Sequence, residues 1–286
     1  MFRPELLITP SIDALIDLAL AEDLGLGDAT SDAVVPPTAT ATAELQAREA
    51  LVVCGRPIVD RLFERWGSRA PSLEWLVGEG QTTARDTVVA TLQGRLRDVL
   101  ALERTVLNFV QRMSGVATQT QRYVAAVAGT RARIVDTRKT LPGWRALDKY
   151  AVRIGGAHNH RAALDGGILI KDNHLRAAGG IAAAVASARR NASHALRVEV
   201  EVEDLLGLEA ALSAGAEVVL IDNFTPELAR EAVSLAAGRA LIEASGGINE
   251  STVRAFAEAG VDLISVGALT HSVRAADLAL EVRLDC

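Results

Sequence analysis

The chain has 286 residues, 49% of them hydrophobic, and a formal net charge of −6. It is long enough for two domains or one large one with a substantial buried core. An acidic balance without basic tails or long basic runs argues against nucleic-acid binding. With two cysteines, no signal peptide and no apolar run approaching the roughly eighteen residues of a membrane span, we expect a cytoplasmic protein without a disulfide framework, a zinc site or a membrane partner.

The first third of the chain mixes helical and strand patterns. A capped helix is expected to begin at Pro10-Ser11 and to stop before Gly25. Residues 38 to 94 show alternating or β-branched stretches between Gly and Pro residues, which indicates a small mixed sheet. From Leu96 to Ala128 the pattern is helical, with a break expected at Ser114-Gly115, so we place a domain boundary near residue 112.

Beyond Arg131 the chain alternates short apolar strands with Ala-rich helical stretches. Strand and helix alternation with short connections predicts right-handed βαβ units and a parallel sheet, either open or closed into a barrel. Six strands are expected, at residues 133–136, 167–171, 197–202, 217–222, 240–244 and 262–266.

Each expected strand ends in a polar residue or a glycine. Six different strands then present these groups at one face, as the carboxyl-terminal rim of a barrel does. A doubly wound sheet would instead focus its site at one switch point, and no G-x-G-x-x-G follows a strand here. The groups are Asp136-Thr-Arg-Lys139, Lys171-Asp-Asn-His174, Glu201 with Glu203, Asp222-Asn223, Ser245-Gly-Gly247 and Gly267-Ala268.

Cationic and imidazole side chains gather in three successive segments, residues 136–145, 158–161 and 170–174. A single Arg or Lys is more often a solvated surface residue. Five or six cations at successive strand ends indicate an anion-binding site instead. Two turns of small residues after the late strands, at residues 244–248 and 266–272, favour a phosphate, although Ser-Gly-Gly alone is as often only a turn.

Glu201 and Asp222 end neighbouring strands and are expected to face the same cavity. Two carboxylates that face a phosphate-rich ligand hold magnesium, or they pair with neighbouring lysines, and the spacing leaves both interpretations open. Glu199 and Glu203 share the strand face of Glu201, so periodicity does not decide which of the three acids reaches a metal.

Eleven motifs follow one another in order from about residue 15 to the end: residues 22–31, 103–108, 114–118, 136–143, 149–153, 159–161, 169–174, 199–202, 222–224, 245–247 and 266–272. Any one of them recurs by chance, but eleven in register do not. On these motifs the chain resembles the quinolinate phosphoribosyltransferases, also called carboxylating nicotinate-nucleotide pyrophosphorylases.

The resemblance implies an open, incomplete TIM-like α/β barrel over residues 113–272, beside an N-terminal α/β sandwich domain over residues 1–112, against which residues 273–286 pack. It implies that quinolinate and 5-phosphoribosyl 1-pyrophosphate react, with Mg²⁺, to nicotinate mononucleotide, pyrophosphate and carbon dioxide, a step of de novo NAD biosynthesis. It further implies a homodimer in which Arg104 enters the partner's site, and leaves a higher oligomer open.

Roles for individual residues follow from the same resemblance. The quinolinate binders are Arg104, Arg138, His160, Arg161 and Lys171. The binders of phosphoribosyl pyrophosphate are Lys139, Glu201, Asp222, Ser245, Gly246, Gly247, Gly267 and His271. Lys139, Lys171, Glu201 and Asp222 are the catalytic residues, and Glu201 and Asp222 hold Mg²⁺ directly or through water.

Physical chemistry supports these roles. Quinolinate is a dianion, so its burial requires cations, and the planar fork of Arg matches a carboxylate. Loss of pyrophosphate builds negative charge on the leaving group, which Lys139 and magnesium stabilise. The alkylated ring nitrogen then stabilises the carbanion left by decarboxylation, so we expect no dedicated base. Lys171 is expected to accompany the electron shift or to deliver a proton.

Some residues are expected to be bystanders. His194 is expected on the solvated surface, and structural roles are favoured for His158 and His174. The turn at residues 162–167 and Trp144 depart from the family pattern, which puts the backbone and packing of these loops in doubt.

Three alternatives remain. A related pyrophosphorylase found beside molybdate transport genes shares Thr-Arg-Lys-Thr but generally lacks a full Leu-Ile-Lys-Asp-Asn-His. A nicotinate-specific phosphoribosyltransferase has no use for cations that bind a second carboxylate. A barrel aldolase or lyase would form a Schiff base at Lys139 or Lys171. A non-catalytic paralogue is disfavoured, because every expected charged position is filled.

Overall fold

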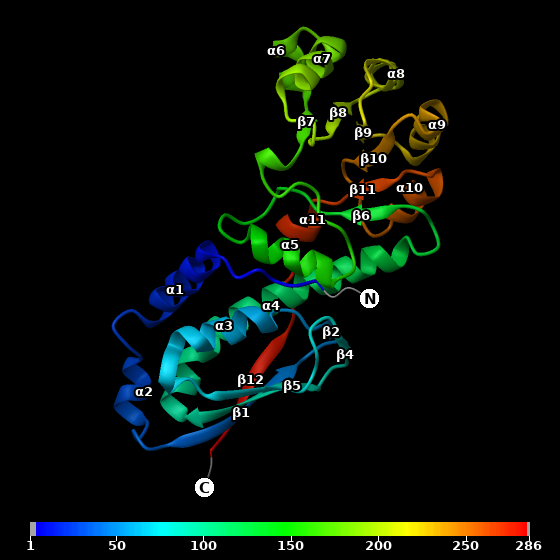
Figure 1. Cartoon of the computed structure of the whole chain (residues 1–286). Helices are drawn as coiled ribbons and strands as arrows, with labels where there is room; N and C mark the ends of the chain where they lie inside the picture. The colour runs from blue at the N-terminus through cyan, green and yellow to red at the C-terminus, as the bar shows by residue number, and fades with distance from the viewer. Residues whose placement is uncertain (1–3, 285–286) are drawn as a thin grey trace. The chain divides into compact units, whose positions relative to one another are not determined.

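A computed structural model describes residues 4–284 and divides the chain into two compact units (Figure 1). The sandwich unit contains the residues up to Gln121, residues 141–156 and the residues from Val273 onward. The barrel unit contains residues 122–140 and 157–272. The boundary expected near residue 112 falls inside a helix, and residues 141–156 join the sandwich unit although they lie between two barrel strands in the sequence.

The sandwich unit is built on a four-stranded antiparallel sheet in the order β12-β1-β5-β3. In β1 every second residue, Ala41 through Ala47, is buried, because successive side chains of a strand point to opposite faces. Its elements are α1 (Pro10–Leu24), α2 (Ala29–Val34), β1 (Thr40–Ala47), β2 (Leu51–Val52), α3 (Arg56–Trp66), η1 (Gly67–Arg69), β3 (Ser72–Trp75), β4 (Thr82–Thr83), β5 (Val88–Arg95), most of α4 (Leu96–Ala126), α5 (Arg145–Ile154) and β12 (Leu278–Leu284).

Helix α1 begins at Pro10 and ends at Leu24, as the sequence predicts, with Gly25 at a φ of 51° just after it. Helix α4 continues through Ser114-Gly115, so the predicted break there is wrong. Ser114 is fully buried, and its hydroxyl bonds the backbone of Cys54. A Cβ at Gly115 would lie 2.3 Å from the carbonyl oxygen of Arg274. This glycine therefore serves a close backbone approach, not the end of a helix.

The barrel unit contains a six-stranded parallel sheet in the order β6-β11-β10-β9-β8-β7. Strands β7 to β11 follow one another, whereas β6 lies beside β11, so the sheet is open between β6 and β7. The open α/β barrel and the α/β sandwich expected from the sequence are confirmed. The strands are β6 (Arg133–Val135), β7 (Ile168–Ile170), β8 (Val198–Val202), β9 (Val218–Asp222), β10 (Leu241–Ser245) and β11 (Leu263–Ser265).

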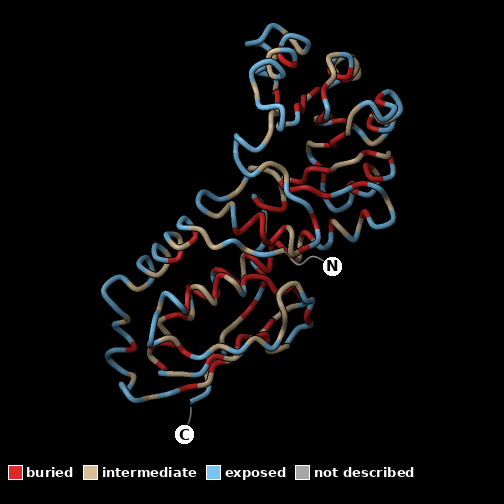
Figure 2. Tube along the Cα trace, viewed as in Figure 1, coloured by how far each residue is buried: buried red, intermediate tan, exposed pale blue. Residues whose placement is uncertain are grey.

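Helices follow the strands of this unit and cover them. Asp204 and Thr225 cap two of these helices, because their side chains accept hydrogen bonds from the backbone N–H groups of Gly207 and Leu228. Figure 2 shows buried residues along the strands and exposed residues on the outer faces of the helices. The helical segments are α6 (Asp172–Ala178), α7 (Ile181–Asn191), α8 (Leu205–Ala214), α9 (Pro226–Ala236), α10 (Val253–Ala259), α11 (Ala268–His271) and the 3-10 helix η2 (Leu164–Gly166).

The register of the parallel strands brings their polar carboxyl ends together. Asp222 at the end of β9 is aligned with Ser245 at the end of β10, and Glu201 of β8 is aligned with Leu220 of β9. Side chains from several strands thus meet at one edge of the sheet. Between residues 4 and 284, no helix is both long and apolar enough to cross a membrane.

Candidate active site

A cavity of about 400 Å³ lies at the carboxyl ends of the barrel strands. Eight of the site residues predicted from the sequence line it, and all of them belong to the barrel unit. The lining residues are Thr137, Arg138, Lys139, His160, Arg161, Leu169, Lys171, Glu201, Leu220, Asp222, Glu243, Ser245 and Ser265.

Asp136 fixes the loop that carries His160 and Arg161. Its carboxylate is fully buried and accepts hydrogen bonds from the backbone N–H of His160, at 2.8 Å, and from the side-chain amide of Asn159, at 2.6 Å. The guanidinium of Arg161 donates to the carbonyl oxygen of Gly167 at 2.8 Å. This bond joins the two ends of the turn at residues 162–167, whose shape the sequence left in doubt and which contains a 3-10 helix.

Arg161 and Arg138 lie close enough for their charges to interact. Burial lowers the pKa of Arg161, and the neighbouring Arg138 cation lowers it further, while Glu199 acts in the opposite direction. Two cations held together in a partly buried site repel each other until an anion neutralises them. The arrangement therefore favours binding of a carboxylate between the two guanidinium groups.

Lys139 lies beside the turn that follows β11. Its backbone N–H donates to the Thr137 hydroxyl at 3.1 Å, and its carbonyl oxygen accepts from the Thr270 hydroxyl at 2.8 Å. A Cβ at Gly267 would lie 2.9 Å from Nε2 of His271 and 3.4 Å from Cδ of Lys139. The fold thus brings Lys139, Gly267 and His271 together.

A second glycine turn follows β10. Gly246 and Gly247 both have positive φ angles, 95° and 62°, which favour glycine. A Cβ at Gly246 would lie 2.2 Å from Oδ1 of Asn223, so only glycine lets this turn approach the end of β9. The turn lies directly after Ser245, whose side chain lines the cavity.

The acids on β8 and directly after it lie in different surroundings. Glu201 lines the cavity and forms an ion pair with Lys171. Glu199 faces a second cavity at the opposite ends of the strands, and Glu203 is exposed and lines neither. Of the three acids that periodicity left open, only Glu201 is therefore placed beside Asp222 in the candidate active site.

Arg104 does not line this cavity. It belongs to the sandwich unit and is exposed on α4, one turn before the exposed Asn108. An exposed arginine and amide one turn apart are available to a ligand or a partner surface.

The sequence interpretation missed Glu243 and Asp136. Glu243 lies in the middle of β10 with 1% of its surface exposed, and burial, followed by the nearby Glu199, raises its pKa to about 7. A signal was available, because Glu243 interrupts the apolar run Leu241-Ile-Glu-Ala244. Asp136 belongs to the strand-end motif at residues 136–139, but its role as the acceptor that holds the His160 loop depends on a contact across the fold.

The expected bystanders have structural or surface positions. His194 is exposed, as predicted. Nδ1 of His174 accepts a hydrogen bond from the Lys171 backbone N–H at 2.9 Å and so helps to begin α6. His158 is exposed, but its backbone pairs with Val135. Trp144 stacks on Phe109 with ring centroids 5.0 Å apart.

Comparison with known proteins agrees with this geometry. The family model described as quinolinate phosphoribosyl transferase, C-terminal domain, matches residues 116–281, and the N-terminal domain model of the same family matches residues 28–114. The chain belongs to the quinolinate phosphoribosyl transferase family. The enzyme class expected from the sequence, a pentosyltransferase, is confirmed by this membership.

The sequences of related proteins align with nearly the whole chain of this quinolinate phosphoribosyl transferase family member. The probable nicotinate-nucleotide pyrophosphorylase (carboxylating) of Bacillus subtilis is 39% identical over 270 residues, which cover 94% of this chain and 93% of the relative. The nicotinate-nucleotide pyrophosphorylase (carboxylating) of Mycobacterium leprae is 42% identical, with 92% and 94% covered. The solved nicotinate-nucleotide pyrophosphorylase of Francisella tularensis superposes with a TM-score of 0.92 at 39% identity, with 98% and 99% covered.

Proposed function

We propose that this enzyme transfers the phosphoribosyl group of 5-phosphoribosyl 1-pyrophosphate to quinolinate and removes one carboxylate, giving nicotinate mononucleotide, pyrophosphate and carbon dioxide. The observation that carries the proposal is the single cavity in which Arg138, Lys139, Arg161 and Lys171 meet the carboxylates of Glu201 and Asp222. The names of the relatives support the same reaction.

Quinolinate fits the cationic side of the cavity. Its two carboxylates are adjacent on a planar ring, and two guanidinium forks bind such a dianion with defined orientation. Arg138 and Arg161 are the pair in this position, and the repulsion between them is relieved when the dianion binds. Lys171 and His160 border the same space. A nicotinate-specific enzyme would leave part of this positive charge without a partner.

The opposite side of the cavity suits the phosphoribosyl substrate. Lys139 lies against Gly267 and His271, and Ser245 leads into Gly246, whose backbone approaches the end of β9 without a side chain in the way. Small residues of this kind let backbone N–H groups reach phosphate oxygens. As pyrophosphate leaves, negative charge builds on its oxygens, and the ammonium group of Lys139 stabilises that charge.

The donor set also suits Mg²⁺. Mg²⁺ prefers oxygen ligands and usually binds through one or two carboxylates together with substrate phosphates and water. Glu201 and Asp222 line one cavity and supply such carboxylates, while Lys171 and the Asn223 amide already hold them in place. When bound, Mg²⁺ neutralises charge on the diphosphate. We assign Glu201 and Asp222 to this ion, directly or through water.

Decarboxylation follows from the charge on the ring. After transfer, the ring nitrogen carries a positive charge, which stabilises the electron pair left on the adjacent carbon when carbon dioxide departs. No base is required for this step. The cavity must hold the remaining carboxylate and then provide one proton.

A homodimer completes the proposal. Arg104 is exposed on the sandwich unit, and in the proposed dimer it reaches the quinolinate site of the partner subunit. A C2 dimer in which each subunit contributes a residue to its partner's site contains two identical shared sites. The free, buried Cys54 suits a reducing compartment such as the cytoplasm.

A comparison of two pyridine substrates tests the function. Purified protein is incubated with Mg²⁺, phosphoribosyl pyrophosphate and either quinolinate or nicotinate, and the products are identified by mass spectrometry. Quinolinate is expected to give nicotinate mononucleotide, whereas nicotinate gives none. Turnover of nicotinate without turnover of quinolinate would contradict the proposal. An Arg161→Lys variant, which keeps the charge but loses the fork, is expected to raise KM for quinolinate by about tenfold or more.

A further inference from the structure

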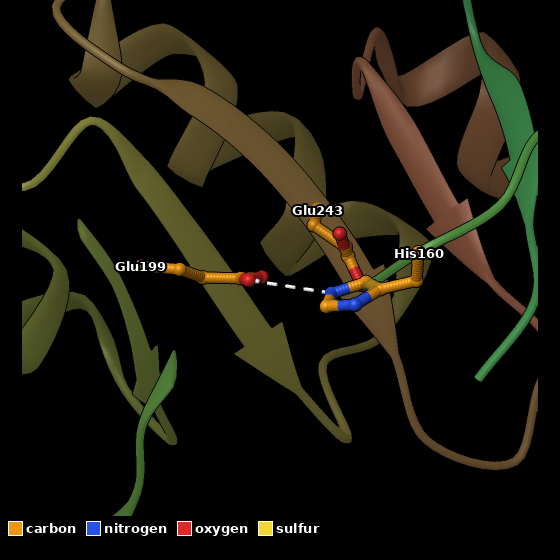
Figure 3. A group of neighbouring side chains, drawn as sticks. All are labelled: His160, Glu199 and Glu243. Atoms are coloured by element: carbon orange, nitrogen blue, oxygen red, sulfur yellow. Dashed lines mark ion pairs between the residues drawn. The ribbon is translucent and has the colours of Figure 1, made fainter. Parts of the chain in front are cut away.

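Three side chains meet between the candidate active site and the cavity at the amino ends of the strands. Figure 3 shows Glu199 of β8 and Glu243 of β10 directed at the imidazole ring of His160. Nε2 of His160 lies 3.3 Å from Oε2 of Glu199 and 3.7 Å from Oε1 of Glu243. The side chains of the two acids are 10% and 1% exposed.

Each of the two acids has one carboxylate oxygen that makes no hydrogen bond within the protein. Oε1 of Glu199 and Oε1 of Glu243 are buried without a hydrogen-bond partner. Two ionised carboxylates at this depth would each need a positive charge or a proton, because an uncompensated buried charge costs several kcal/mol. The cluster therefore requires either a cation or a shared proton.

The hydrogen bonding of His160 distinguishes these possibilities. Nδ1 of His160 accepts a hydrogen bond from the Arg161 backbone N–H at 2.8 Å, which assigns the ring proton to Nε2. Nε2 then faces the two carboxylates as a donor. A histidine that binds a metal does the reverse, since it coordinates through the unprotonated nitrogen and donates with the other. The ring orientation thus favours a proton on the carboxylates over a metal ion.

Glu243 has access to two spaces. It lines the candidate active site, and it also lines a second cavity of about 310 Å³ on the other side of the cluster. This second cavity lies at the amino ends of the strands, where the exposed Arg133 and Arg197 also line it. His160 and Arg161 line both cavities too, and Glu243 is the carboxyl group among these three residues, so it borders both the substrate site and a second route for protons.

The proposed reaction requires a proton at the ring carbon that loses its carboxylate. When carbon dioxide leaves, the adjacent ring carbon keeps the electron pair of the broken bond and must be protonated to give the product. The arginines of the site do not release protons, and Lys171 is paired with Glu201. A neutral carboxylic acid beside the cavity is a suitable donor.

We propose that Glu243 donates the proton that takes the place of the departing carboxylate on the ring, an inference that rests on the proposed function. The bond between the ring carbon and the carboxylate breaks, its electron pair stays on the ring carbon, and carbon dioxide leaves. The O–H bond of Glu243 then breaks, and its proton forms the new C–H bond. The resulting carboxylate regains a proton from solvent through the cavity at the amino ends of the strands.

The electrostatic surroundings agree with this role. Burial, then the carboxylate of Glu199, raises the pKa of Glu243 to about 7, whereas His160, Ser265 and Lys171 lower it. With this pKa, about half of the Glu243 carboxyl groups are protonated at pH 7, so the acid can release and regain its proton near neutral pH. The charged and titratable groups that line the two cavities around it are Arg133, Arg138, Lys139, His158, His160, Arg161, Lys171, Arg197, Glu199, Glu201 and Asp222.

A Glu243→Gln variant tests the proposal, because glutamine keeps the shape of the side chain and removes the transferable proton. Single-turnover rapid-quench experiments would measure pyrophosphate release and nicotinate mononucleotide formation separately. Pyrophosphate release is expected to stay within about threefold of the wild type, while nicotinate mononucleotide formation slows at least about 100-fold. In the wild type, product formation is expected to fall above about pH 7, and the variant is expected to lack this decline.

Matched variants make the result specific. Glu243→Asp keeps an acid and is expected to restore part of the product formation together with the alkaline decline. Glu231→Gln, on the exposed face of α9, is expected to behave as the wild type. If Glu243→Gln does not fold, the shift of the alkaline decline in Glu243→Asp decides the question, and an unchanged profile overturns the proposal.

Other outcomes would also overturn it. Equal slowing of both products indicates a structural role, and no slowing of either shows that another group donates the proton. Elemental analysis could instead find one zinc or manganese ion per chain in the wild type and none in Glu243→Gln. This would show that the cluster binds a metal ion and not a proton. If the wild type releases no pyrophosphate with quinolinate, the proposed function fails rather than the role of Glu243.

Discussion

Replacing Glu243 by glutamine is predicted to change how the stability of the protein depends on pH. Burial and the nearby Glu199 raise the pKa of Glu243 from 4.5 to about 7 in the folded chain. The unfolded chain therefore releases this proton at lower pH than the folded chain. As pH rises from about 4.5 to about 7, the free energy of unfolding of the wild type falls, and it falls no further above the folded pKa.

The size of the effect follows from the two pKa values. Their difference, 7 minus 4.5, is about 2.5 pH units. At about 1.4 kcal/mol for each unit, ionisation of Glu243 destabilises the wild type by about 3 kcal/mol at neutral to alkaline pH. Glutamine does not ionise, so the variant does not lose this stability. For a chain of this size the difference corresponds to about 5 °C in Tm between about pH 5 and about pH 8.

Thermal unfolding of both proteins at these two pH values measures the effect. The two proteins share all other titratable groups. A Tm difference between them that changes with pH therefore reports the ionisation of Glu243. The Tm of Glu243→Gln minus that of the wild type is expected to increase with pH, whereas the same difference for Glu231→Gln stays constant. A difference for Glu243→Gln that is independent of pH, or that decreases as pH rises, would refute the reasoning.

Further predictions concern the dimer, the sandwich unit and the phosphate turn. Arg104→Ala and Lys171→Ala are each expected to be inactive, and random reassembly of the two is expected to restore about a quarter of the wild-type activity, because half of the dimers then hold one intact site. No recovery in verified heterodimers argues against shared sites. Arg112→Ala removes two hydrogen bonds of 3.0 and 3.1 Å to the buried Asp148. The free energy of unfolding, measured in urea, is therefore expected to fall by about 3 kcal/mol, and an unchanged urea midpoint would contradict this. Gly246→Ala places a side chain against Asn223 at a residue whose φ is 95°. KM for phosphoribosyl pyrophosphate is expected to rise by about tenfold, while KM for quinolinate changes little. Equal changes in the two KM values would show that the defect is not confined to this turn.

The barrel was predictable because its strands have a local signature. Short runs of Val, Ile and Leu that end in polar residues identify buried parallel strands, and the carboxyl ends of such strands must meet at one rim. For this reason Arg138, Lys171 and Asp222 were placed in one site from the sequence alone, and the structure brings them together.

Residues whose role depends on contacts across the fold could not be found in this way. Gly115 has the appearance of a helix break, but the backbone of Arg274, far along the chain, requires its missing side chain. Helix α5 lies in sequence between two barrel strands, yet it belongs to the sandwich unit, where Arg112 pairs with Asp148 and Trp144 stacks on Phe109. Local patterns carry no record of these long-range partners.

Glu243 escaped the sequence interpretation for a different reason. Polar residues at the ends of strands predict which side chains lie at the rim, whereas Glu243 lies in the middle of β10. An acid inside an apolar strand is costly unless it is protonated or paired, so its presence there is itself an indication of function. The meeting with Glu199 and His160 becomes visible only when β8, β10 and the loop between α5 and β7 are placed together.

The ratio of carbon dioxide to pyrophosphate tests the proposed reaction most directly. Quinolinate labelled in the carboxylate adjacent to the ring nitrogen is incubated with the enzyme, Mg²⁺ and phosphoribosyl pyrophosphate, and both products are measured in the same sample. We expect one labelled carbon dioxide for each pyrophosphate, and none when phosphoribosyl pyrophosphate is omitted. Pyrophosphate without carbon dioxide, or carbon dioxide without phosphoribosyl pyrophosphate, would contradict it.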